Sequence, residues 1–106
     1  MKVTVLGCGR WGTFLAWYTA SLGNEVYLWG RPESTGFQQL AATRKNEYLQ
    51  LPVEVQLGNS LAEALAFSDY IIISISAQNL RLLAKQINEF KLDGKTFILC
   101  MKGLES

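Results

Sequence analysis

The residues best suited to chemistry stand at the start of the chain, where residues 7–12 read G-C-G-R-W-G. An apolar run at residues 3–6 precedes these glycines, and a helix-like stretch follows them at once. A G-x-G-x-x-G pattern between a strand and a helix is typical of a loop that holds the pyrophosphate of a dinucleotide. Gly7 would allow the tight turn, Gly9 would let a phosphate approach the backbone, and Gly12 would let the helix pack closely on the strand. We therefore expect dinucleotide binding here, and a glycine-rich turn without a ligand is the alternative.

Two side chains at the start of the expected helix are further candidates for contact with the cofactor. A helix N-terminus offers free N–H groups and the positive end of its dipole to phosphates. Arg10 and Trp11 stand at this point, and we expect both to contact the phosphates or the adenosine. The alternatives are a solvated cation for Arg10 and core packing for Trp11.

Arg31 stands where related folds distinguish NAD from NADP. Folds selective for NAD place a carboxylate at the end of the second strand, where it binds the ribose 2′-hydroxyl. Here that strand ends in Trp29-Gly30-Arg31 without a carboxylate, and an arginine pairs well with a 2′-phosphate. Glu33 lies at a similar sequence distance, but Pro32 predicts that Glu33 belongs to the first turn of the next helix. We therefore favour NADP over NAD, with a surface arginine as the alternative.

The composition argues against several other classes of site. The chain has 106 residues, a net charge of +1 and no histidine, so neither a metal site nor histidine-dependent hydride transfer is expected. Cys8 and Cys100 do not form a C-x-x-C pair, and we expect reduced, structural thiols. No basic patch indicates nucleic acid, and neither a signal peptide nor a membrane span is expected. We expect a cytoplasmic protein.

Hydrophobic periodicity predicts five strands that alternate with four helices. The first helix carries large apolar residues at helical spacing and alanines that permit close packing: Trp11, Phe14, Leu15, Tyr18, Leu22, Ala16 and Ala20. Strands are expected at residues 2–7, 25–29, 53–57, 70–75 and 96–101. Helices are expected at about 11–22, from 32 to 44, after Ser60, and from 76 to 90.

This alternation predicts an α/β fold of the Rossmann type. Right-handed crossovers favour a doubly wound parallel sheet with strand order 3-2-1-4-5, in three α/β/α layers. The ligand crevice is then expected at the switch point, beyond the carboxyl ends of the first and fourth strands. Residues 7–12, 74–78 and 101–103 should converge there.

Five motifs in order resemble the N-terminal domain of the soluble, NAD(P)-dependent glycerol-3-phosphate dehydrogenases. They are the glycine loop with Thr13, Leu15 and Ala16; L-W-G-R at 28–31; N-E-Y-L at 46–49 with Pro52; the apolar strand 71–76 with Gln78 and Arg81; and K-G-L-E at 102–105. The sequence departs from the family at Ser76 and Ala77, where Pro and Ser are frequent, and at Pro32. The resemblance covers the whole chain but well under half of a typical member.

The resemblance implies a two-domain enzyme in which residues 1–106 form the dinucleotide-binding domain. A second, largely helical domain, absent from this sequence, would supply the catalytic lysine, so no catalytic residue is expected here. Lys102 resembles a family lysine that contacts both the cofactor and the substrate phosphate, and a solvated lysine is its alternative. The implied cofactor is NADP or NAD, bound through Gly7, Gly9, Arg10, Trp11, Gly12, Arg31 and Lys102.

The implied reaction is the reversible reduction of dihydroxyacetone phosphate to sn-glycerol 3-phosphate for glycerophospholipid synthesis. The full-length enzyme could form a homodimer, although the sequence does not give the oligomeric state. A ketopantoate-type reductase and a non-enzymatic dinucleotide-sensing module are the alternatives, and K-G-L-E disfavours the first. A methyltransferase is disfavoured because it too would want a carboxylate at the end of the second strand.

Overall fold

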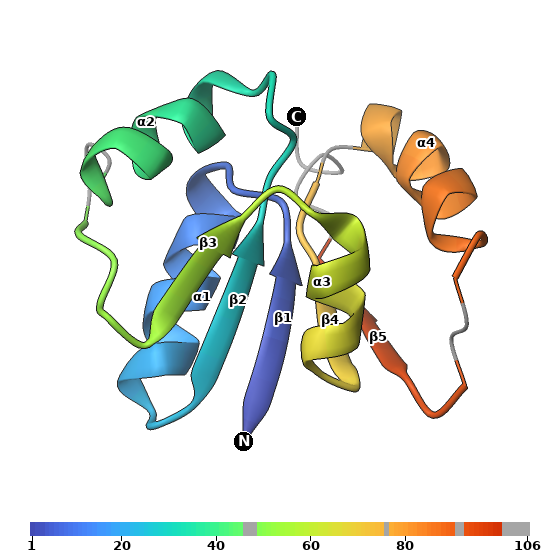
Figure 1. The fold of residues 1–106 in the computed structure, drawn as a ribbon, viewed down its shortest axis with the longest axis horizontal. Helices are drawn as coiled ribbons and strands as arrows, with labels where there is room; N and C mark the ends of the chain where they lie inside the picture. Colours follow the sequence, from blue (N-terminus) through green and yellow to red (C-terminus); the bar gives the residue numbers. More distant parts are fainter. Residues whose placement is uncertain (46–48, 76, 91–92, 101–106) are drawn as a thin grey trace.

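Five parallel strands form one sheet in the order β3-β2-β1-β4-β5 (Figure 1). The strands are β1 (Lys2–Leu6), β2 (Glu25–Trp29), β3 (Val55–Gly58), β4 (Tyr70–Ile73) and β5 (Thr96–Leu99). The helices are α1 (Arg10–Ser21), α2 (Thr35–Thr43), α3 (Leu61–Phe67) and α4 (Ala77–Ile87). This computed structural model describes residues 1–45, 49–75, 77–90 and 93–100. The predicted alternation and strand order are confirmed.

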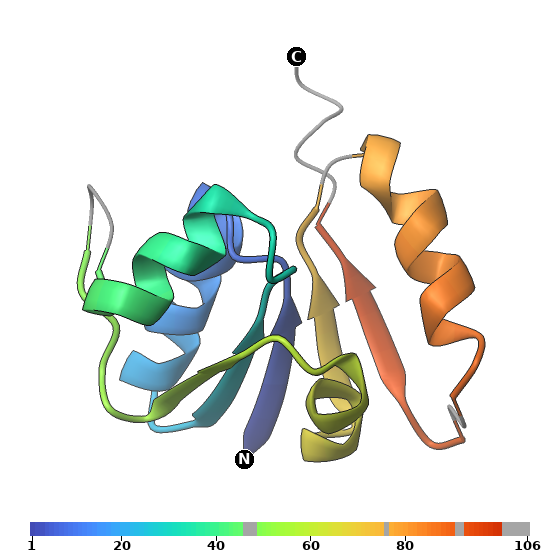
Figure 2. The same ribbon diagram turned by 45° about the horizontal axis from the view of Figure 1, so that its top comes forward.

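The helices cover both faces of the sheet, which gives the three predicted layers. In Figure 1, α1 lies behind the sheet and α3 lies in front of it. One half of the apolar core joins α1 and α2 to β1, β2 and β3, and the other half joins α3 and α4 to β1, β2 and β4. In Figure 2 all strand arrows point toward the same end of the sheet, and the connections to α1 and α4 start at that end. The sequence predicts the ligand crevice at this end, beyond the carboxyl ends of the strands.

Helix α1 packs its small residues against the sheet and leaves its large ones outside. Thr13 and Ala16 are completely buried and Ala20 is nearly so. The large apolar residues at helical spacing are exposed instead, among them Trp11, Phe14, Tyr18 and Leu22. The large apolar residues at helical spacing therefore lie on the outer face of α1, because the close approach of α1 to β1 leaves room only for small side chains.

The second helix begins later than the sequence predicts. Pro32 and Glu33 precede α2 in a turn, which the N–H of Ser34 closes by donating to the Arg31 carbonyl at 3.0 Å. Ser34 is the N-cap, and its side-chain oxygen accepts from the N–H of Phe37. Glu33 is therefore an exposed turn residue rather than part of the first helical turn.

A second cap and most of the last helix agree with the sequence. The Ser60 side chain accepts from the N–H of Glu63 at 3.2 Å and so starts α3. In α4, Leu83 and Ile87 are buried, and Leu80 packs against the same core half, as does Phe90 just after the helix. Ser76, which was expected to open this helix, lies outside the described residues.

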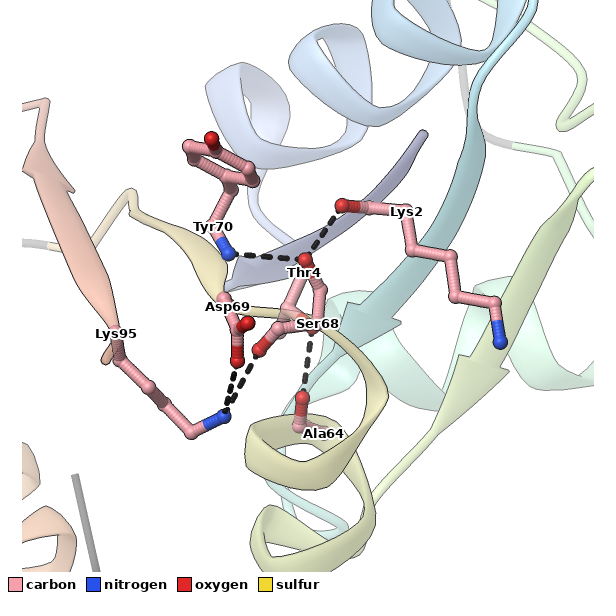
Figure 3. A network of polar contacts seen from close by, with 7 residues as sticks. All are labelled: Lys2, Thr4, Ala64, Ser68, Asp69, Tyr70 and Lys95. Atoms are coloured by element: carbon pink, nitrogen blue, oxygen red, sulfur yellow. Dashed lines mark hydrogen bonds and ion pairs between the residues drawn. The ribbon is translucent and has the colours of Figure 1, made fainter. Parts of the chain in front are cut away.

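Polar contacts around Ser68 join three strands near their amino ends, at the opposite end of the sheet from the glycine loop (Figure 3). The Ser68 hydroxyl donates to the Lys2 carbonyl of β1 and accepts from the N–H of Tyr70 in β4. The ammonium group of Lys95, just before β5, donates to the Ser68 carbonyl at 3.1 Å and to Asp69 Oδ1 at 3.3 Å. These contacts fix where β4 and β5 start relative to β1.

Strand β5 is the least covered part of the sheet. All of its residues are exposed, although three of them, Phe97, Ile98 and Leu99, are large and apolar. Beside it, β4, β5 and α4 line an open, mostly apolar hollow of about 230 Å³, whose lining includes Ile73, Leu83 and Phe97. Continuous apolar runs are typical of parallel strands that are buried on both faces. The surface of β5 therefore resembles that of an inner strand without its covering.

Candidate functional site

Gly7 and Gly12 are required by the local geometry of the loop between β1 and α1. Gly7 has a φ of +116°, which side-chain-bearing residues rarely adopt, and its N–H donates to the Trp29 carbonyl at 2.8 Å. A Cβ atom on Gly12 would clash with the Gly7 carbonyl oxygen, and one on Gly7 would clash with the Ser74 carbonyl oxygen. The predicted tight turn and the predicted close packing of helix on strand are both present.

Gly9 differs from the other two glycines because nothing crowds it. It is the N-cap of α1 with extended backbone (φ −74°, ψ −167°), and no side chain caps the helix. A Cβ built on Gly9 would meet no atom within 4 Å. Among the described residues, no side chain caps the first N–H groups of α1, and the space at Gly9 is open. This is the arrangement that binds phosphate at a helix start.

Thr13 and Cys8 support this loop from inside, a role that the sequence analysis did not assign. Thr13 is completely buried and its hydroxyl donates to the Cys8 carbonyl at 3.2 Å, while its N–H donates to the Gly9 carbonyl. Burial raises the pKa of the Cys8 thiol, and a hydrogen bond with Ser34 acts in the opposite direction. Cys8 and Cys100 are both free thiols. The sequence feature that could have indicated this role is the threonine directly after the third glycine.

The glycine loop meets the end of β4, as predicted, and also the end of β2. The N–H of Ser74, after β4, donates to the Leu6 carbonyl at 2.9 Å, and its carbonyl lies against Gly7. Gly30, after β2, leaves space that the Cys8 sulfur and the Phe37 ring fill, so a side chain there would clash with both. The carboxyl ends of β1, β2 and β4 therefore converge. The predicted third segment, residues 101–103, lies outside the described residues.

Arg31 lies at the end of β2 against an aromatic ring. Its guanidinium carbon stands 5.6 Å from the centroid of the Trp29 ring, within the usual range of a cation–π contact. Its Nη2 atom is buried and has no hydrogen-bond partner among the described residues. Arg31 thus places a positive charge at the carboxyl end of β2, where the sequence predicts recognition of the adenosine ribose.

Three further residues were predicted to contact the cofactor: Trp11, Arg10 and Lys102. Trp11 is 44% exposed and makes an edge-to-face contact with Phe14, with ring centroids 6.0 Å apart, so its alternative role in the core is wrong. Arg10 is the first residue of α1, beside Gly9. Lys102 lies outside the described residues, and its predicted contact with cofactor and substrate stays a prediction.

A comparison with protein families identifies the relatives of this loop and sheet. The family model described as the N-terminus of NAD-dependent glycerol-3-phosphate dehydrogenase matches residues 2–106. The chain belongs to this family. Membership favours the leading interpretation of the motifs over a ketopantoate-type reductase or a sensing module.

Curated members of the family match nearly the whole chain. The glycerol-3-phosphate dehydrogenase [NAD(P)+] of Chlorobium limicola is 37% identical over 110 residues, which cover 99% of this chain and 32% of the relative. The enzyme of the same name from a Thermoanaerobacter species is 32% identical, with 100% and 33% covered. The chain therefore spans about a third of the length of these relatives.

Solved structures confirm the fold. The glycerol-3-phosphate dehydrogenase of Coxiella burnetii superposes with a TM-score of 0.84 at 22% identity, covering 95% of this chain and 32% of that one. The Saccharomyces cerevisiae enzyme gives a TM-score of 0.79 at 24% identity, covering 96% and 33%. In the part of the chain that the structure describes, no helix is long and apolar enough to cross a membrane, and no acidic or thiol cluster could hold a metal ion.

Proposed function

We propose that this chain binds a nicotinamide dinucleotide as the cofactor domain of a glycerol-3-phosphate dehydrogenase. The observation that carries the proposal is the open space at Gly9 next to the uncapped start of α1. A pyrophosphate there accepts hydrogen bonds from the first N–H groups of the helix and interacts favourably with its dipole. Gly7 and Gly12 hold these groups in position, while Arg10 and Trp11 border the site.

The whole enzyme reduces dihydroxyacetone phosphate to sn-glycerol 3-phosphate in this proposal, and so supplies a precursor of glycerophospholipids in the cytoplasm. The curated relatives carry the name glycerol-3-phosphate dehydrogenase [NAD(P)+] and are about three times as long as this chain. Residues 1–106 would form the dinucleotide-binding domain, and the remaining two thirds would supply the catalytic lysine. Lys102 would neutralise charge on the substrate phosphate and contact the cofactor.

NADP is the cofactor that we favour. Arg31 brings a cation to the end of β2, and no carboxylate lies within β2 beyond Glu25 at its other end. Glu33 is exposed in the turn after β2 rather than in the first turn of α2, so the preference rests on Arg31 and not on the exclusion of Glu33. A 2′-phosphate pairs with a guanidinium through charge-assisted hydrogen bonds, whereas a 2′-hydroxyl gains little from it.

Calorimetric titration of the chain with NADPH and with NADH tests cofactor binding. A Gly9→Val variant should keep the circular dichroism spectrum, because its Cβ meets no atom, and should lose binding, because the side chain fills the phosphate site. The contrasting variant is Gly12→Ala, whose Cβ would clash with the Gly7 carbonyl and should destabilise the fold by about 1–3 kcal/mol or more. Undiminished binding by a folded Gly9→Val variant would show that the glycine loop is not the site.

A further inference from the structure

Trp29 makes two contacts that lie at the border of the cofactor site. Its main-chain carbonyl accepts from the N–H of Gly7, at 2.8 Å, in the glycine loop. Its indole ring carries the guanidinium of Arg31, at 5.6 Å from guanidinium carbon to ring centroid. One residue therefore connects the phosphate-binding loop to the cation expected at the adenosine ribose.

The indole ring is the contact that fixes the Arg31 side chain. The main chain of Arg31 is held by the Ser34 N–H, which donates to its carbonyl, but its Nη2 atom has no hydrogen-bond partner among the described residues. The ion pair that the described part of the chain contains joins Lys95 to Asp69 at the opposite end of the sheet. Without the ring, the long Arg31 side chain would sample several rotamers and would lose entropy on meeting a ligand.

The presence of a tryptophan at position 29 also indicates a role besides core packing. Trp29 is 4% exposed, and its Nε1 is buried without a partner among the described residues. A buried N–H without an acceptor destabilises the folded state, and a phenylalanine at this position would avoid that cost. Tryptophan, however, gives the strongest cation–π attraction of the aromatic residues.

We propose that Trp29 is a positioning residue, whose ring holds the Arg31 guanidinium ready to meet the 2′-phosphate of NADP. This inference rests on the proposed NADP preference. Trp29 acts through Arg31 and does not itself touch the cofactor. Its removal should therefore weaken the discrimination between NADPH and NADH more than it weakens binding of either dinucleotide in general.

The contact can be tested first in the unliganded wild-type chain by nuclear magnetic resonance. A guanidinium over an aromatic face has its side-chain proton resonances shifted upfield by the ring current. Arg31 should show this shift, with Arg44 and Arg81 as internal comparisons and Arg31→Lys as the assignment control. Ordinary resonances for Arg31 would overturn the proposal without any need for a variant.

The variants Trp29→Phe and Trp29→Leu then test the role. Trp29→Leu should abolish the shift and lower the ratio of NADPH to NADH affinity by roughly threefold to tenfold, with NADH affinity changed by less. Trp29→Phe should reduce both the shift and the ratio in part, because phenylalanine attracts a cation less strongly than tryptophan does. Trp17→Leu, which removes an exposed tryptophan, should keep both. Equal losses for the two dinucleotides would indicate a structural role and overturn the proposal, as would an unchanged ratio in Trp29→Leu.

The outcomes separate this inference from the proposed function. A wild-type chain that binds both dinucleotides equally well contradicts the NADP preference, even if the Arg31 shift is present. A wild-type chain that prefers NADPH but shows no Arg31 shift contradicts only the role of Trp29. If Trp29→Leu does not fold, the wild-type shift and the Trp29→Phe ratio still decide the matter.

Discussion

The three glycines of the loop have different roles: the fold requires Gly7 and Gly12, whereas it does not require Gly9. Gly7 needs its positive φ, and Gly12 needs the absence of a Cβ because α1 touches the Gly7 carbonyl there. Gly9 needs neither and faces open space. The motif thus combines two glycines that the fold requires with one, Gly9, to which the proposed function assigns the ligand.

Arg31→Asp is the residue-scale test of cofactor preference. Wild type should bind NADPH more tightly than NADH, because a charge-assisted pair with the 2′-phosphate contributes on the order of 1.5–3 kcal/mol, less where solvent screens it. The aspartate should repel the phosphate and accept from the ribose 2′-hydroxyl, so the preference should reverse. Calorimetric titration with both dinucleotides measures the ratio.

The matched control for Arg31→Asp is Lys85→Asp, which makes the same change of charge in an exposed position in the last turn of α4. It should leave the ratio of the two affinities as in wild type. If Arg31→Asp also leaves it unchanged, Arg31 is a surface residue and the NADP preference is wrong.

The buried thiol of Cys8 should make the stability of the fold decrease at alkaline pH. Burial raises the pKa of its thiol above the ordinary 9.0, so the folded chain keeps this proton to higher pH than the unfolded chain does. The resulting stability is fully present below about pH 9 and is lost as pH rises toward the folded pKa. Urea unfolding at a series of pH values should show this loss in wild type and less of it in Cys8→Ala. Equal losses would assign the effect to other groups.

At the scale of elements, the Ser68 contacts determine how β4 and β5 join the sheet. Ser68→Ala should lower the free energy of unfolding by roughly 1–3 kcal/mol, because the Lys2 carbonyl and the Tyr70 N–H both lose a partner. Urea denaturation followed by circular dichroism measures the change.

Ser21→Ala is the element-scale comparison, since the Ser21 hydroxyl donates to the Tyr18 carbonyl on an exposed part of α1. Its effect should be smaller than that of Ser68→Ala, because water replaces an exposed hydrogen bond at little cost. Equal effects in the two variants would mean that the Ser68 contacts are no more important than a surface hydrogen bond.

At the scale of the whole molecule, the proposed function makes the described surface one wall of a catalytic site. Reduction of a ketone needs a proton donor for the developing alkoxide, and the sequence contains no histidine. Water must also be kept from the reacting atoms, which an open wall does not do.

This chain alone should therefore not oxidise NADPH with dihydroxyacetone phosphate above the rate in buffer. Loss of absorbance of the reduced nicotinamide measures this, with the full-length Chlorobium limicola relative assayed in parallel as the reference. Turnover by the chain that disappears in Lys102→Ala would contradict the expectation and would make Lys102 the proton donor.

Most of the topology could be predicted because it depends on local patterns. The apolar run of β1, the glycines after it and the continuous run of β4 are all contiguous in the sequence, and strand–helix alternation restricts the order of the strands. The packing of α1 could not be predicted in this way. Its large apolar residues and its alanines both recur at helical spacing, and only the fold shows that the inner face holds Thr13, Ala16 and Ala20.

The sequence by itself determined the family, the glycine loop and the cation at residue 31, since each is carried by residue types at fixed short spacing. Only the tertiary structure decided that Gly9 is open, that Pro32 and Glu33 precede α2, and that Arg31 rests on Trp29. These features depend on distances between atoms of separate elements. Such distances follow from how closely α1 packs on β1 and how the strands align, which no short sequence pattern encodes.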